Sequence, residues 1–336
     1  MTVAHRLEAP LMEARALSKR FVKRLDLAGR IAASLGTGLR DETVHAVDRV
    51  DLAIAKGEVV GLVGESGCGK STLGRMFAGL LPPTEGEVRF KGRNRDGLAG
   101  ADARAARLAV QMIFQDPYAS LNPRARVAQI IGEAPVFHGL VARRDIDAYV
   151  DEMLHRVGLE PAFRRRYPHQ FSGGQRSRVG IARALAVKPE FLVCDEAIAA
   201  LDVSIQAQIL NLFMDLREQL DLTYLFISHD LGVVQHITDR VVIMYLGRVV
   251  ESAPTTELFR QPNHPYADAL LAEVPRISTS KRTFHPVVGE IPSPLEPPPG
   301  CHFHPRCPHA MARCRTEVPV LKEIAPGRLS ACHLNA

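Results

Sequence analysis

Short apolar runs alternate with longer stretches of helical periodicity over the first 280 residues. Four of these runs contain no charged residue, a pattern typical of strands buried on both faces of a sheet: residues 59–63, 191–194, 224–227 and 241–244. Helical patterns lie between them, for example over residues 204–220. Alternation of strand and helix predicts an α/β fold with a parallel sheet that is covered on both faces.

Two regions depart from this alternation. Residues 125–170 have helical patterns but no buried-strand run, so we expect a helical subdomain over about residues 116–185. The last 56 residues hold ten of the 23 prolines and five of the 13 histidines. Proline resists regular helix and strand. We therefore predict one main domain over residues 1–280, without internal repeats, and an irregular appendage over residues 281–336.

Composition narrows the class of protein. The chain has 336 residues, of which 46% are apolar and 24% charged, and this balance excludes a disordered or collagen-like chain. The net charge of +5 is too small to indicate a nucleic-acid partner. No apolar run approaches the roughly 18 residues that cross a bilayer, and residues 1–10 lack the pattern of a secretion signal. We expect a cytoplasmic chain, in which disulfides are improbable.

A phosphate-binding loop follows the apolar run at 59–63 and opens a helical stretch. Eight residues fit the pattern G-x-x-x-x-G-K-[ST], and Thr72 follows them: Gly64, Glu65, Ser66, Gly67, Cys68, Gly69, Lys70 and Ser71. The glycines let backbone N–H groups surround phosphate, and Lys70 and Ser71 are predicted to bind the terminal phosphates and Mg²⁺ of ATP. The alternative is a glycine-rich turn that binds no ligand, but such a turn would not need to lie between a buried strand and a helix. Cys68 occupies an unrestricted position of the pattern and is interpreted as a bystander.

Two carboxylates end the apolar run at 191–194. Asp195 is placed to hold Mg²⁺, and Glu196 is the candidate general base for the attacking water. In isolation, a solvated acidic pair would be the preferred interpretation. A phosphate-binding loop on the same predicted sheet favours the catalytic one.

Four further motifs resemble those of ABC-transporter ATPases. The segment Phe171, Ser172, Gly173, Gly174 and Gln175 resembles the signature motif, Gln115 the Q-loop, Asp202 the D-loop and His229 the switch histidine. Their order and spacing make the resemblance specific. It implies a P-loop NTPase fold of the ABC nucleotide-binding type, with a parallel-sheet core, a helical subdomain and an antiparallel β part.

The resemblance also implies how such a domain works. Two domains pair head to tail, and each ATP lies between the P-loop of one and the signature motif of the other. Gln115 would sense the γ-phosphate and complete the Mg²⁺ ligands with Ser71 and Asp195, and His229 would orient the water or the γ-phosphate. The sequence departs from the family at Ala197, where proline is usual, and at Ala199, where serine is common.

Adenine recognition is less sharply predicted. Phe21 is the candidate aromatic residue that stacks on the base, and its alternative is a place in the core. Residues 22–44 follow it without a clear role.

A narrower resemblance is to the ATPases of oligopeptide and dipeptide importers. It rests on residues 120–124, 201–210 and 263–266 and on the tail from Gly300 to His333, and the pair Gln175–Arg176 resembles the second ATPase subunit of such systems. It implies a second ATPase subunit (a paralogue or the same chain), two transmembrane permease subunits and an extracytoplasmic substrate-binding protein. It implies no nucleic acid, and a location on the cytoplasmic face of the plasma membrane.

The cargo stays open, because the ATPase does not contact it. Relatives move peptides, nickel, glutathione, opines or oligosaccharides. Two other classes compete with an importer subunit: a soluble ABC ATPase that acts on ribosomes or DNA, and a non-catalytic binder. Against them stand the single ATPase domain and the intact Lys70, Asp195, Glu196 and His229.

Four of the six cysteines lie in the tail, at Cys301, Cys307, Cys314 and Cys332. Their spacing is not that of paired zinc ligands, and Cys307 is followed by proline as in some iron–sulfur motifs. Some members of the resembling family carry a [4Fe–4S] cluster on such a tail. Zinc, with help from His302, His304, His309 or His333, and unliganded thiols are the alternatives. A metal would staple a segment with little core of its own.

Overall fold

The computed structural model describes residues 9–26, 40–116, 119–199, 201–272 and 289–335. The strands in this part of the chain form an eight-stranded and a four-stranded sheet. Their bounds are β1 (Met12–Lys23), β2 (Glu42–Ile54), β3 (Val59–Val63), β4 (Glu85–Phe90), β5 (Arg93–Asn94), β6 (Val110–Ile113), β7 (Phe191–Asp195), β8 (Thr223–Ile227), β9 (Arg240–Tyr245), β10 (Arg248–Pro254), β11 (Lys322–Ala325) and β12 (Arg328–Ser330).

The larger sheet has the order β11-β12-β10-β9-β3-β8-β7-β6. Its centre, from β9 to β6, is parallel, and β10, β12 and β11 continue it with antiparallel pairing. The four apolar runs of the sequence are β3, β7, β8 and β9, so the predicted parallel core is confirmed. In β3, β7 and β8 every residue is buried, as the unbroken apolar pattern requires.

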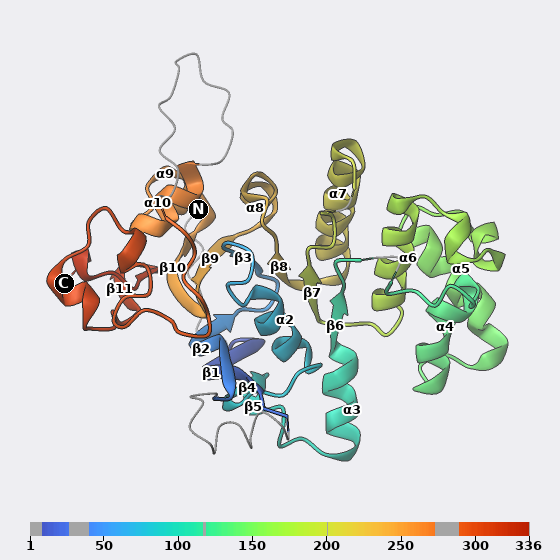
Figure 1. Cartoon of the computed structure of the whole chain (residues 1–336). Coiled ribbons are helices and arrows are strands. Elements are labelled where there is room, and N and C mark those ends of the chain that lie inside the picture. The colour runs from blue at the N-terminus through green and yellow to red at the C-terminus, as the bar shows by residue number, and fades with distance from the viewer. Residues whose placement is uncertain (1–8, 27–39, 117–118, 200, 273–288, 336) are drawn as a thin grey trace, which may run out of the picture.

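Helices cover both faces of this sheet (Figure 1). Their bounds are α2 (Lys70–Ala78), α3 (Gly100–Ala109), α4 (Val127–Phe137), α5 (Ile146–Arg156), α6 (Gly173–Leu185), α7 (Val203–Leu220), α8 (Leu231–Ile237), α9 (Thr255–Arg260) and α10 (Pro265–Ala272). None of the helices among the described residues is long and apolar enough to cross a membrane.

Alternate residues of one strand serve two different cores. In β7, Leu192 and Cys194 pack in the cluster that includes α6 and α7. Phe191 and Val193 pack in the other, which includes α2 and the four-stranded sheet. The period of two along a strand produces this division. The sheet is therefore held between two layers, and its carboxyl ends are left to carry polar groups.

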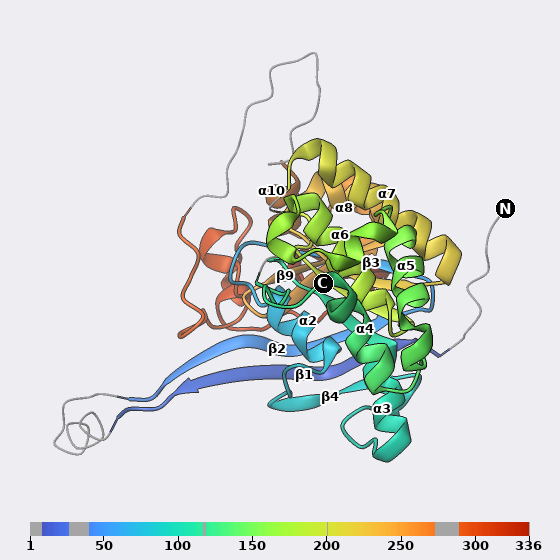
Figure 2. The same ribbon diagram turned by 90° about the vertical axis from the view of Figure 1, so that its right-hand side faces the viewer.

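The predicted helical subdomain is present as α4, α5 and α6. These three helices pack on one another and stand beside the sheet near β6 (Figures 1 and 2). Their apolar faces bury residues such as Ile131, Val150 and Leu154. The sequence pattern located them because the apolar residues recur at helical spacing.

The smaller sheet has the order β2-β1-β4-β5, and all its pairs are antiparallel. Strands β1 and β2 form a long hairpin that projects from the body (Figure 2). Residues 22–26 and 40–44 lie in its outer arms, so part of the stretch without a predicted role extends this hairpin. Residues 27–39 lie outside the described part.

The C-terminal appendage is more ordered than its proline content predicts. Short 3-10 turns occupy much of it, but β12 pairs with β10 and so joins the tail to the main sheet. Phe303 is fully buried, with its ring centroid 5.3 Å from those of both Tyr245 and Tyr266. A buried aromatic side chain anchors a segment that lacks regular backbone pairing.

His264 makes this anchor sensitive to acid. The imidazole is buried, Nδ1 accepts the Tyr266 N–H at 3.0 Å, and the ring lies 5.8 Å from that of Phe303. Burial lowers the pKa of His264 from 6.5 to about 4. Between these two pH values the imidazole of His264 is protonated in the unfolded chain but not in the folded chain. The free energy of unfolding that is present above pH 6.5 is therefore lost as the pH falls toward about 4.

We expect His264→Asn, which keeps a hydrogen-bond acceptor, to flatten this acid dependence by about 2 kcal/mol at about pH 5. Denaturant unfolding of both proteins at about pH 7 and 5 measures the difference. The exposed His309, changed to asparagine, serves as the control. Equal acid slopes for wild type and His264→Asn would contradict the assignment.

Candidate active site

The phosphate-binding loop connects β3 to α2, as predicted, and its glycines have conformations that a side chain would disturb. Gly64 and Gly69 have φ angles of 151° and 107°. A Cβ on Gly69 would lie 2.1 Å from the Ala46 carbonyl oxygen, and one on Gly64 would lie 2.2 Å from that of Met244. The loop is thus wedged against β2 and the end of β9. This close approach fixes its shape.

Lys70 begins α2 and is buried. Its Nζ donates to the carbonyl oxygens of Gly64, at 2.7 Å, and Glu65, at 2.9 Å. The sulfur of Cys68 lies 3.8 Å from the same Nζ, and burial raises the pKa of the Cys68 thiol. Cys68 is therefore a neutral neighbour of the ammonium group, which agrees with its interpretation as a bystander.

Ser71 and Asp195 meet at the end of the sheet. The Ser71 hydroxyl donates to Asp195 Oδ1 at 2.8 Å, and Asp195 is buried. Burial raises the pKa of Asp195, partly offset by this hydrogen bond and by the charges of Arg75 and Lys70. A hydroxyl and a buried carboxylate side by side are suitable oxygen ligands for Mg²⁺. The third predicted ligand, Gln115, instead directs its amide to Glu196.

Glu196 joins the other two predicted catalytic residues. Gln115 Nε2 donates to Glu196 Oε2 at 2.5 Å, and His229 Nδ1 lies 3.2 Å from Glu196 Oε1. Glu196 has a positive φ of 48°, uncommon for a residue with a side chain, and its N–H is held by the Ile227 carbonyl at 3.0 Å. Residues far apart in the sequence thus form one cluster around a single carboxylate.

The signature segment is built around the start of α6. Ser172 Oγ accepts the Gln175 N–H at 3.3 Å, and Gln175 Oε1 accepts the Ser172 N–H at 3.1 Å, which forms a capping box. Phe171 is buried against Phe163, whereas Ser172 and Gly173 are exposed. The segment lies on a different element from the P-loop of the same chain and presents its polar residues to the outside.

The remaining predicted residues lie at exposed positions. Asp202 precedes α7 and is exposed, and the neighbouring Val203 is 82% exposed. Phe21 is 42% exposed, opposite Val44 on β2, and Lys19 Nζ lies 5.4 Å from its ring centroid. Phe21 is therefore outside the core clusters and partly exposed. The same hairpin approaches the P-loop, because the backbone of Ala46 on β2 lies against Gly69.

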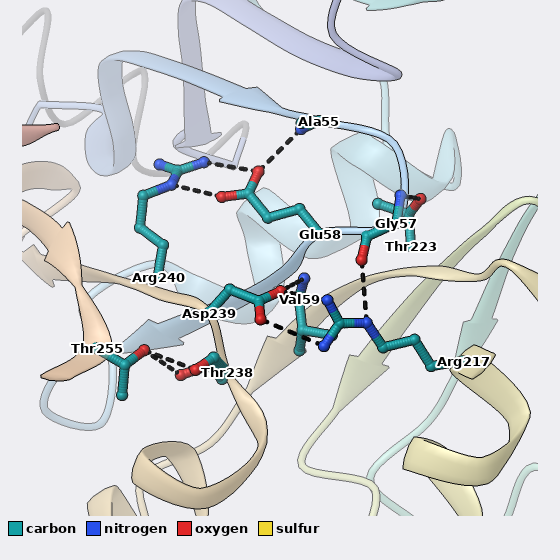
Figure 3. A network of polar contacts seen from close by, with 10 residues as sticks. All are labelled: Ala55, Gly57, Glu58, Val59, Arg217, Thr223, Thr238, Asp239, Arg240 and Thr255. Atoms are coloured by element: carbon teal, nitrogen blue, oxygen red, sulfur yellow. Dashed lines mark hydrogen bonds and ion pairs between the residues drawn. The ribbon is translucent and has the colours of Figure 1, made fainter. Parts of the chain in front are cut away.

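A polar network supports the strand that leads into the P-loop (Figure 3). Arg240 Nε pairs with Glu58 at 2.7 Å, and the Val59 N–H donates to Asp239 at 2.8 Å. Arg217 donates to the Gly57 carbonyl at 3.0 Å and also pairs with Asp239. The network ties the start of β3 to α7 and to the start of β9. The sequence does not predict this network, because its residues belong to no local motif.

Two further residues contact the P-loop from distant parts of the chain and were also missed. The Tyr266 hydroxyl accepts the Glu65 N–H at 2.9 Å. Arg306 pairs with the Glu65 carboxylate through both terminal nitrogens, at 2.8 and 2.9 Å. No sequence signal relates positions separated by 241 residues in this way.

The four tail cysteines are neighbours. Burial, together with the thiols of Cys314, Cys332 and Cys307, raises the pKa of Cys301 to about 11. Backbone N–H groups donate to all four sulfurs, at Cys314 from Met311 at 3.4 Å. Yet no group of three or more His, Cys, Asp or Glu among the described residues is placed where it could hold a metal ion. The expectation of an iron–sulfur or zinc centre is not supported by this placement.

The fold and this site define a P-loop ATPase of the ABC class. A family model described as "ABC transporter" matches residues 47–199, and one described as "Oligopeptide/dipeptide transporter, C-terminal region" matches residues 250–314. The structure of a dimeric ATP-binding cassette, MJ0796, bound to ADP and Pi has a TM-score of 0.61 and 27% identity, covering 73% of this chain and 98% of the other. The cbiO1 subunit from Clostridium perfringens also gives 0.61, with 29% identity and coverage of 76% and 92%.

Two curated relatives extend the similarity to most of the chain. The oligopeptide transport ATP-binding protein AppF of Bacillus subtilis is 52% identical over 295 residues, which is 87% of this chain and 90% of the relative. A putative peptide import ATP-binding protein of Brucella ovis is 45% identical over 97% of this chain and 98% of the relative. The chain belongs to the ATP-binding subunits of ABC transporters, in the family that carries the oligopeptide/dipeptide transporter C-terminal region.

Proposed function

We propose that this chain powers the import of peptides through a membrane ABC transporter by binding and hydrolysing ATP. The observation that carries the proposal is the meeting of Gln115, Glu196 and His229 next to the Ser71–Asp195 pair. A binding module would have no need of this arrangement. The peptide cargo rests on the relatives and on the matching C-terminal region.

The roles follow from the positions of the side chains. Loop N–H groups and the start of α2 bind phosphate, Lys70 pairs with the terminal phosphates, and Ser71 and Asp195 hold Mg²⁺. When bound, Mg²⁺ neutralises charge that develops on the transferred phosphoryl group. Glu196 takes the proton of the attacking water, while Gln115 and His229 keep its two oxygens in place. Phe21 offers its exposed ring to adenine.

The signature residues complete the site of a second domain. Ser172 and the glycines open α6, where exposed N–H groups can bind the γ-phosphate of an ATP held by the partner. Asp202 and Val203 lie exposed at the start of α7 and would meet the same partner. The partner is a second ATPase subunit, a paralogue or another copy of this chain. Two permease subunits and an extracytoplasmic binding protein complete the assembly, in which this chain lies at the cytoplasmic face of the membrane.

The four cysteines of the tail carry a separate proposal, a metal centre. Its four thiols accept hydrogen bonds from backbone N–H groups, and burial together with the other three thiols raises the pKa of Cys301. Such hydrogen bonds also tune thiolates that bind clusters. We propose a [4Fe–4S] cluster on Cys301, Cys307, Cys314 and Cys332, with zinc as the alternative. Binding would require the four thiols to move closer together, because their placement among the described residues holds no metal ion. The group would staple the tail and take no part in hydrolysis.

Purification of the tagged chain from native membranes in mild detergent tests both parts. We expect two permeases, a second ATPase and peptides held by a binding subunit. If the same assembly holds metal, glutathione or sugar, the cargo is not a peptide. If ribosomes or DNA co-purify without a permease, the chain is not a transporter subunit. Iron and sulfide analysis of an anaerobic preparation tests the tail, for which bound zinc without iron would exclude the cluster.

A further inference from the structure

The C-terminal appendage reaches directly into the phosphate-binding loop. Arg306 lies in the turn His304–Arg306 of the tail, and its side chain is only 5% exposed. Both terminal nitrogens meet the Glu65 carboxylate, and one also lies 3.4 Å from the Tyr245 hydroxyl. The rings of Tyr245 and Phe303 flank the guanidinium group, with centroids at 5.9 and 6.0 Å. A two-pronged ion pair in buried surroundings fixes both partners in one orientation.

Glu65 is held at its backbone as well as at its side chain. Its N–H donates to Tyr266, and its carbonyl oxygen accepts from Lys70 Nζ. Through this one residue, the tail is coupled to the ammonium group that pairs with phosphate. A change at Arg306 therefore acts two contacts away from the nucleotide, without touching it.

Charge gives the contact a second consequence. Glu65 is the only acidic residue between Gly64 and Thr72, and a bound polyphosphate would bring several negative charges close to it. Coulomb repulsion between these groups weakens binding unless a cation is paired with the carboxylate. Arg306 supplies that cation from a position with little exposure to water, where screening by salt is weak.

We propose that Arg306 is a positioning residue for ATP binding: it clamps Glu65, fixes the first turn of the P-loop and neutralises the carboxylate of that turn. The C-terminal region thereby sets the affinity of the nucleotide site. The inference rests on the proposed nucleotide site, and it assigns to the tail a part in ATP binding in addition to its packing.

The main test is Arg306→Gln in the full-length chain. We expect the Kd and KM for MgATP to rise about tenfold while kcat stays within about twofold, because Arg306 contacts none of the reacting groups. Arg313→Gln is the matched control, since Arg313 pairs with Glu317 at 3.1 Å on the exposed side of the same tail. Its affinity for MgATP should equal that of the wild type.

A double-mutant cycle separates this role from general stabilisation. With Glu65→Gln in place, the further change Arg306→Gln should alter the Kd for MgATP by less than about twofold, because the carboxylate it neutralises is gone. Arg306→Lys, which keeps the charge but loses the paired geometry, should lie between wild type and Arg306→Gln. This conservative variant also serves if Arg306→Gln does not fold.

Three results would overturn the proposal. An unchanged Kd in a folded Arg306→Gln protein would remove the coupling, as would a tenfold loss that persists unchanged in the Glu65→Gln background. A fall in the melting temperature alone would leave Arg306 a purely structural residue. Lys70→Ala is the control that distinguishes these outcomes from an error in the proposed nucleotide site. If Lys70→Ala also binds MgATP normally, the proposed nucleotide site is wrong.

Discussion

Replacing Glu196 by glutamine is expected to lower the rate of ATP hydrolysis by about 10²–10⁴-fold while ATP still binds. The amide keeps the size of the side chain and can still meet Gln115 and His229, but it cannot take a proton from water. The positive φ of residue 196 is a property of the backbone, so the substitution leaves the turn unchanged.

The variant should also accumulate as an ATP-bound dimer. Contacts that depend on the γ-phosphate persist when hydrolysis is blocked, and the closed state becomes the populated one. Phosphate release measures the rate, and light scattering with and without ATP measures the dimer. The control is Glu190→Gln, whose side chain forms an exposed pair with Lys91 at 2.7 Å, away from the cluster. Undiminished turnover in Glu196→Gln would remove Glu196 as the base.

Lys70→Ala is expected to weaken MgATP binding by at least about a hundredfold. The change removes the buried ammonium group that pairs with phosphate. It also leaves the carbonyl oxygens of Gly64 and Glu65 without their donor, so the loop loses part of its internal support. Binding is the affected step, in contrast to Glu196→Gln.

Titration with a fluorescent ATP analogue measures this loss, and Lys91→Ala provides a lysine control on the exposed pair. Circular dichroism and thermal melting of both proteins show that each is folded. Retained affinity in Lys70→Ala would place the nucleotide elsewhere on the chain.

The sequence predicted those parts of the fold that repeat a local pattern. Strands β3, β7, β8 and β9 each contain an unbroken apolar run, and the P-loop combines residue types that only phosphate binding requires together. Strands β1 and β2 escaped notice because they mix charged and apolar residues and contain several register shifts. In the tail, the proline-rich composition concealed β12, which pairs with β10, and β11, which pairs with β12.

The residues of the site also fall into those that a local motif predicts and those that it does not. Gln115, Glu196 and His229 could be named as candidates from their motifs, but no motif indicates that Gln115 contacts Glu196 instead of the Ser71–Asp195 pair. Arg306 and the supports of β3 could not be found at all. Their partners in the P-loop and at the start of β3 lie 160 to 241 residues away, and no local period carries that information.

The position of β3 bears on how the chain is synthesised. This apolar strand leaves the ribosome early, yet its two neighbours in the sheet, β8 and β9, begin only at residues 223 and 240. During translation at about 5–20 residues per second, β3 waits roughly ten seconds or longer for either partner. The nascent chain thus exposes an aggregation-prone segment over that interval. Its capture by a cellular chaperone, and slower translation across residues 64–222, would determine how much of the protein reaches its native state.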